Sequence, residues 1–142
     1  MIRKKVMVFG VFDGLHAGHH EFLHQAKQCG NYLIAIVTPD NVVQELKGKR
    51  PKLTIAERFE HLKDIDHVDA VVVGDNVLGS WYVLDLHRPK VIALGYDQIR
   101  LKDELERYFK NADWQADIKL MHAHEGDKYH SSILKDVKKP IQ

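Results

Sequence analysis

The chain has 142 residues, 44% of them hydrophobic, which is enough for one domain with its own core. Its 21 Lys and Arg against 20 Asp and Glu leave a formal net charge of +1, which excludes the broad positive field of a nucleic-acid-binding or membrane-surface protein. The single cysteine, Cys29, cannot form an internal disulfide, and the apolar run near the start is too short for a signal or membrane segment. We therefore expect one cytoplasmic domain, residues 1–142, with no nucleic-acid or membrane partner.

Five short apolar runs alternate with helical patterns along the chain. They cover residues 5–10, 32–37, 70–74, 90–95 and 117–123. Alternation of this kind predicts an α/β domain with a five-stranded parallel sheet and crossover helices. The runs are apolar at consecutive positions, which is typical of strands with helices on both faces of the sheet.

Several helix ends are marked by local signals. Gly30 predicts a C-terminal stop for the first helix, and Thr54 followed by Glu57 predicts a capping box at the start of the helix over 55–65. Ser131 or Ser132 is a suitable N-cap for the last helix.

Two loops that follow apolar strands carry unusual chemistry: GVFDGLHAGH at 10–19 and GYDQ at 95–98. In open α/β sheets, ligands bind beyond the carboxyl ends of the strands, where the strand order reverses. If these two strands are neighbours, both loops face one pocket.

The stretch HAGHHEFLH, residues 16–24, contains two overlapping motifs: His-x-Gly-His and the zinc-binding His-Glu-x-x-His. Helix geometry places His19 on the inward side and sends His20, Glu21 and His24 to the polar face. A zinc site also needs a third protein ligand, and Lys27 and Gly30 break the longer zinc pattern. We therefore predict no metal-binding residues and a solvated face for His20 and His24.

His16 and His19 remain as candidates for chemistry. They lie at the start of a predicted helix, where free N–H groups and the helix dipole favour anions, and Gly18 between them permits a close backbone approach. This geometry suits a triphosphate. The alternative is that Gly10, Gly14 and Gly18 only shape a tight turn.

GVFDGLHAGH resembles the Gly-x-Phe-Asp-x-x-His-x-Gly-His motif of the cytidylyltransferase-like nucleotidyltransferases. Further family-like features follow in order: the basic LKGKRP loop, Glu57-Arg58, LGYDQ and HSSILKDV. Within the superfamily the chain is most similar to the archaeal-type FAD synthases and the glycerol-3-phosphate cytidylyltransferases. The resemblance implies a Rossmann-like sheet of order 3-2-1-4-5, a homodimer, Mg²⁺, and transfer of a nucleoside monophosphate from a triphosphate to an acceptor phosphate.

The resemblance also implies roles for individual residues. The catalytic set is His16 and His19 at the triphosphate, Lys47 at a phosphate, with Lys49 and Arg50 as competitors, and Arg58 in a bidentate phosphate contact. Arg58 as an exposed helix residue is the alternative. Asp13 orders the loop or helps to place Mg²⁺. The implied nucleotide-binding set is Gly10, Val11, Phe12, Asp13, Gly18, Gly95, Asp97, Ser131 and Ser132.

The choice of nucleotide and acceptor rests on the segment before the last helix. Cytidylyltransferases of the family carry Arg-Thr-Glu-Gly-Ile-Ser-Thr before the last helix, whereas this chain has EGDKYHSSIL, with Glu125 at the Arg position. This favours ATP, and FMN is the best single acceptor. The alternatives are CTP with glycerol 3-phosphate or another alcohol phosphate, and a non-catalytic nucleotide-binding protein. For Trp81 and Tyr82 three roles stay open: stacking on an aromatic acceptor, packing in the core, or packing at a dimer contact.

Overall fold

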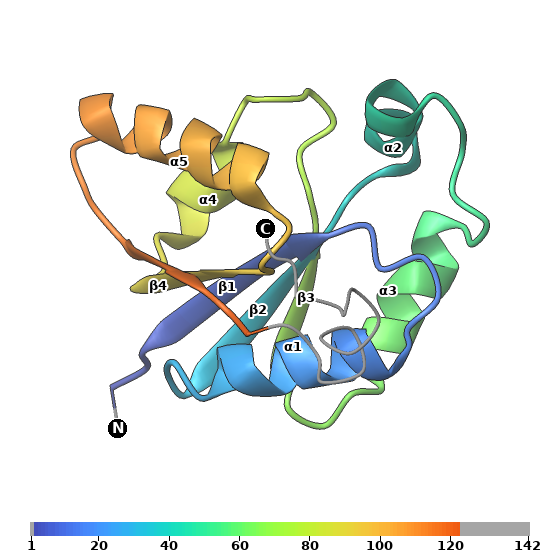
Figure 1. Cartoon of the computed structure of the whole chain (residues 1–142), viewed down its shortest axis with the longest axis horizontal. Coiled ribbons are helices and arrows are strands. Elements are labelled where there is room, and N and C mark those ends of the chain that lie inside the picture. Colours follow the sequence, from blue (N-terminus) through green and yellow to red (C-terminus); the bar gives the residue numbers. More distant parts are fainter. Residues whose placement is uncertain (1, 123–142) are drawn as a thin grey trace, which may run out of the picture.

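A computed structural model describes residues 2–122. Its centre is a five-stranded parallel sheet with the order β3-β2-β1-β4-β5, as predicted (Figure 1). The strands are β1 (Lys5–Gly10), β2 (Tyr32–Val37), β3 (Ala70–Val73), β4 (Val91–Leu94) and β5 (Asp117–Leu120). The observed strands start within one residue of the predicted ones, and β5 ends earlier than expected. Because β1 and β4 pair directly, the two loops with unusual chemistry leave neighbouring strands.

Helices cover both faces of the sheet, which confirms the predicted architecture. The helices are α1 (Ala17–Lys27), α2 (Asp40–Lys47), α3 (Ile55–Lys63), α4 (Tyr82–His87) and α5 (Ile99–Asn111). Figure 1 shows α1 and α3 on one side of the sheet and α4 and α5 on the other, with α2 beyond the strand ends. None of these helices is long and apolar enough to cross a membrane.

Two hydrophobic clusters hold these layers together. On one face, Leu23 of α1 and Leu62 of α3 pack with Val6 and Val8 of β1. On the other face, Met7 packs with Leu105 and the rest of the α4–α5 layer. Successive β1 residues therefore belong to opposite clusters, which explains why the strand is apolar at consecutive positions.

The helix-end signals have mixed outcomes. The predicted Thr54–Glu57 capping box is present at the start of α3. Helix α1 ends at Lys27, as expected near Gly30, but its C-cap is Gln28 in the right-handed region. Gly30 is needed for a different reason: a Cβ there would lie 2.3 Å from the Lys4 carbonyl oxygen. The predicted last helix, with Ser131 or Ser132 as its cap, lies outside the described residues.

Candidate active site

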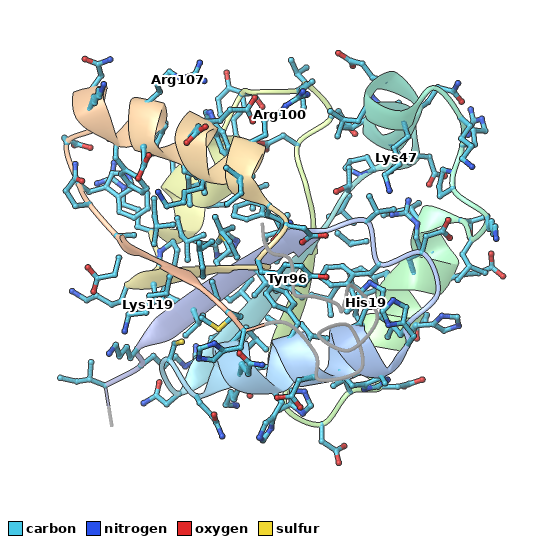
Figure 2. All side chains as sticks on the ribbon, in the orientation of Figure 1. His19, Lys47, Tyr96, Arg100, Arg107 and Lys119 are labelled. Atoms are coloured by element: carbon cyan, nitrogen blue, oxygen red, sulfur yellow. The ribbon has the colours of Figure 1, made fainter. Side chains whose placement is uncertain are left out.

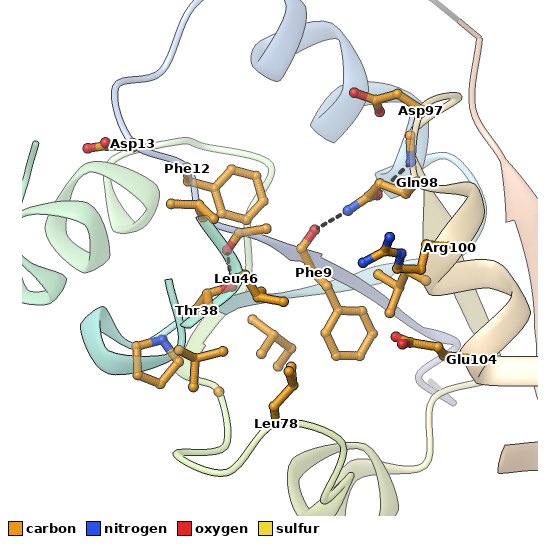
Figure 3. A pocket seen from close by; sticks show the side chains of 18 of the residues that line it. Phe9, Phe12, Asp13, Thr38, Leu46, Leu78, Asp97, Gln98, Arg100 and Glu104 are labelled. Carbon is orange, nitrogen blue, oxygen red and sulfur yellow. Dashed lines mark hydrogen bonds between the residues drawn. The ribbon is translucent and has the colours of Figure 1, made fainter. Parts of the chain in front are cut away.

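A cavity of about 950 Å³ opens at the carboxyl ends of β1, β2 and β4. It is lined by both predicted loops, by α2, by the segment 75–81 and by the first turns of α5. Figure 3 shows side chains from these elements facing the same space. The site therefore lies where the strand order reverses, as the topology of open α/β sheets requires.

The first turn has a strained backbone. Phe12 has φ = 52°, a region that bulky residues rarely adopt, and Gly14 has φ = 89°. The buried Phe12 ring folds back over Gly10, where a Cβ would lie 2.8 Å from the ring, and it meets His19 at 5.9 Å between centroids. Gly10, Val11, Phe12, Asp13 and Gly18 all line the cavity. Strain of this kind persists where the surrounding structure fixes it, and it concentrates at functional sites.

His16 and His19 form a linked pair at the start of α1. His16 is the N-cap, and its Nδ1 accepts the Gly18 N–H at 3.0 Å, while His19 Nδ1 accepts the His16 N–H at 3.3 Å. The ring centroids are 4.0 Å apart. Because each neutral ring accepts at Nδ1, its proton resides on Nε2, which leaves a donor on each ring. Together these contacts form a capping box at the start of α1, although histidine is not a preferred N-cap residue.

The pKa of His19 is lowered from its ordinary value, chiefly by burial and further by the neighbouring His16 and His20. The carboxylate of Asp97, which also lines the cavity, opposes this shift and raises the pKa. A neutral His19 keeps Nδ1 as the acceptor for the His16 N–H. The electrostatics thus preserve the orientation in which Nε2–H is the donor.

Asp13 orders the loop after α2. Its carboxylate accepts the N–H groups of Lys52 and Leu53, each at 2.8 Å, and the Lys52 N–H is the main cause of its lowered pKa. Of the two roles expected for Asp13, these contacts favour loop ordering over placement of Mg²⁺.

Arg58 is buried and is bonded within the protein. Its guanidinium is 0% exposed, so Arg58 is not an exposed helix residue. It donates to the carbonyls of Leu53, Val11 and Thr38 and pairs with Asp40. Its nitrogens are thus engaged with the protein, and Arg58 is absent from the cavity lining. These contacts give Arg58 a structural role, because they fasten the first turn to the end of β2 and to the loop before α3. The expected phosphate contact stays a prediction.

Of the three basic residues weighed in the LKGKRP loop, Lys47 lines the cavity, whereas Lys49 and Arg50 do not. Lys47 is the last residue of α2, and Gly48 ends the helix in the left-handed conformation with φ = 75°. The chain changes direction there and carries the following basic residues away from the cavity. Figure 2 shows Lys47 and Arg100 reaching the site from opposite sides, on α2 and α5.

The second loop is organised by Gln98, the last residue of GYDQ, for which the sequence predicted no role. Its Oε1 accepts the Gly95 N–H at 2.7 Å and its Nε2 donates to the Phe9 carbonyl at 3.0 Å (Figure 3). A Cβ on Gly95 would lie 3.0 Å from Asp97 Oδ1. Gln98 therefore ties the ends of β1 and β4 together, and Gly95 and Asp97 line the cavity beside them.

The outward face of α1 is as predicted. His20, Glu21 and His24 are exposed. Glu21 and His24 bond to Gln25 and Gln28, each four residues further along α1, and the His24 ring also meets His67 edge-on at 5.8 Å. Within residues 2–122, no group of three or more His, Cys, Asp or Glu is placed to hold a metal ion. The zinc-binding interpretation has no support in this part of the chain. Ser131 and Ser132 lie outside the described residues.

A parallel sheet of this order, with a helix N-terminus beside a cavity at the strand ends, is typical of Rossmann-like nucleotide-binding proteins. The family model described as cytidylyltransferase-like matches residues 7–137. The chain belongs to this family, and it is a nucleotidyltransferase.

Relatives and solved structures agree with this assignment. The chain is 41% identical to the FAD synthase of Thermococcus sibiricus over 93% of this chain and 91% of the relative. It is 39% identical to the FAD synthase of Pyrococcus horikoshii, over 92% and 88% of the two chains. A lipopolysaccharide core biosynthesis protein from Thermoplasma volcanium superposes with a TM-score of 0.79 at 27% identity, over 87% of this chain and 99% of that one.

Proposed function

We propose that the protein is an ATP-dependent FMN adenylyltransferase that forms FAD and pyrophosphate. The observation that carries the proposal is the His16–His19 pair, whose two Nε2–H donors lie beside the helix N-terminus in the cavity. The FAD synthase relatives, which match over about nine-tenths of both chains, supply the choice of substrates.

The reaction requires little covalent work from the protein. A phosphate oxygen of FMN attacks the α-phosphorus of ATP in line, the new P–O bond forms, and the bond to the bridging oxygen of pyrophosphate breaks. The attacking oxygen is already anionic at neutral pH, so no general base is required. Donors that meet the charge developing on the phosphates lower the barrier, and His16 and His19 provide them.

The other candidate residues divide between the two substrates. We assign Lys47 to the FMN phosphate, because α2 carries it to the cavity opposite α5. Gly95 and Asp97 are assigned to the adenosine, since they follow β4 beside His19. Ser131 and Ser132, which lie outside the described residues, are proposed to hold the β- and γ-phosphates.

Mg²⁺ remains part of the proposal. Within residues 2–122, the side chains do not fit a metal site held by the protein, because no suitable cluster exists and Asp13 is occupied by backbone N–H groups. We therefore propose that Mg²⁺ arrives bound to the triphosphate. We also propose that the protein is a homodimer and acts in the cytoplasm. Sedimentation of the purified chain tests the oligomeric state.

Pyrophosphate release tests the function directly. The purified protein is assayed with ATP or CTP against FMN and glycerol 3-phosphate, and products are separated chromatographically. FAD from ATP and FMN is the expected result. CDP-glycerol formed from CTP would replace the proposal with the cytidylyltransferase alternative, and nucleotide binding without turnover on any acceptor would identify a non-catalytic protein.

A further inference from the structure

The cavity has a second, largely apolar side that the phosphate chemistry does not use. Phe9 of β1 forms its floor, and Val77 and Leu78 of the 75–81 segment and Trp81 form its wall. Figure 3 shows Phe9, Leu78, Arg100 and Glu104 around this space, while Phe12 and Asp97 mark the other side. We call this space, between the 75–81 segment and the first turns of α5, the apolar compartment.

Trp81 is held there by a strained backbone. It has φ = 59°, which is costly for a large aromatic residue, and it precedes α4. Its ring meets Phe9 edge-on with the ring centroids 6.3 Å apart, and its centroid lies 5.9 Å from that of Tyr108. Asp75 accepts the Val83 N–H at 3.1 Å and so ties the 75–81 segment to the start of α4. These contacts fix an aromatic wall beside the cavity before any ligand arrives. A rigid flat ligand matches such a wall.

Arg100 and Glu104 add polar groups to this compartment. They lie one helical turn apart on α5 and both line the cavity. Within residues 2–122, neither forms a hydrogen bond or an ion pair, although Lys102 and Glu106 on the same helix pair at 2.8 Å. A guanidinium beside a carboxylate offers donors next to acceptors. The imide edge of a flavin, in which an N–H stands between two carbonyls, needs this combination.

We propose that the apolar compartment binds the isoalloxazine ring of the acceptor, with Arg100 donating to the imide carbonyls and Glu104 accepting the imide N–H. This rests on the proposed function, which places FMN as the acceptor. The phosphate end of FMN then points to Lys47 and the histidine pair, and ATP occupies the side of Asp97. Arg100, Glu104 and Trp81 thus determine which acceptor is used rather than how fast phosphate bonds break.

Three variants on one helix test the assignment: Arg100→Ala, Glu104→Gln and the control Arg107→Ala. Arg107 is exposed on α5 and does not line the cavity, so its variant removes an equal charge without touching the ring. Arg100→Ala and Glu104→Gln are each expected to raise KM for FMN about tenfold, the usual worth of a hydrogen bond to a charged group. KM for ATP should stay within about twofold, and Arg107→Ala should change neither.

Riboflavin, which has the ring but no phosphate, separates ring contacts from phosphate contacts. As a competitive inhibitor against FMN, it should weaken about tenfold in Arg100→Ala and remain unchanged in Lys47→Ala, which loses only the phosphate partner. If the wild type makes FAD but the Arg100 and Glu104 variants keep wild-type KM for FMN, the ring lies elsewhere. If their KM for ATP rises instead, the compartment holds the adenine. A wild type that makes no FAD overturns the proposed function itself.

Discussion

Two pairs of candidate site residues, Asp13 with Arg58 and His16 with His19, contact the first turn in different ways. Asp13 and Arg58 bond to backbone atoms through their charged groups. His16 and His19 bond to the backbone through Nδ1, which leaves Nε2 of each ring for the ligand that we propose. Asp13 and Arg58 stabilise the turn, whereas His16 and His19 supply the proposed contacts with the ligand. A charged residue at a motif position therefore does not by itself indicate contact with a substrate. The decisive feature is which of its donor atoms form no hydrogen bond within the protein.

The largest expected effect on activity comes from the removal of one ring of the histidine pair. His19→Ala should lower kcat by about 100- to 1000-fold, the usual cost of losing a donor to developing charge. The free energy of unfolding should change little by comparison, because His19 is only half-buried. Steady-state kinetics and urea unfolding measure the two effects. His20→Ala, the matched control on the outward face, should leave both nearly unchanged; turnover within a fewfold of wild type for His19→Ala would disprove the assigned role.

Arg58→Met should give the opposite result for the first pair. It leaves Asp40 without its partner and three carbonyls without their donor, so we expect a loss of about 3–5 kcal/mol in the free energy of unfolding. Urea unfolding followed by circular dichroism provides the measurement. A fully stable Arg58→Met protein that had lost only turnover would return Arg58 to the role of a phosphate ligand.

This comparison also shows what the sequence could and could not predict. The strands and the inward direction of His19 follow from local patterns, namely runs of consecutive apolar residues and the 3.6-residue helix period. The role of Arg58 depends on carbonyls 20 and 47 residues away, and that of Gln98 on a carbonyl 89 residues away. Such partners are set by tertiary packing, which leaves no local signal.

Lys47→Ala should show a smaller effect than either pair. Loss of one charged contact to the FMN phosphate is expected to raise KM for FMN about tenfold. Lys49→Ala is the matched control, because it removes the same charge from the same loop but from a residue that does not line the cavity. Equal effects in the two variants would mean that the loop acts through its overall charge, and the choice of Lys47 would be wrong.

The smallest expected difference between the two pairs is the pH range over which each changes the free energy of unfolding. Burial lowers the pKa of His19, His67 and His87 below the ordinary value of 6.5, so the unfolded chain binds more protons than the folded chain just below that value. Their contribution to stability is complete above pH 6.5 and is lost as the pH falls through the lowered folded values. The lowered pKa of Asp13 acts in the same direction but at more acidic pH, below its ordinary value of 3.8.

His19→Gln should therefore reduce the loss of unfolding free energy between about pH 7.5 and about pH 5.5, while Asp13→Asn should leave the loss in that range unchanged. Urea unfolding at both pH values measures the difference, and His20→Gln serves as the surface control. NMR titration of the His19 ring gives an independent reading. A His19 pKa at or above 6.5 would mean that the ring readily gains a proton on Nδ1. The hydrogen bond from the His16 N–H would then be lost, and with it the argument that Nε2–H alone faces the triphosphate.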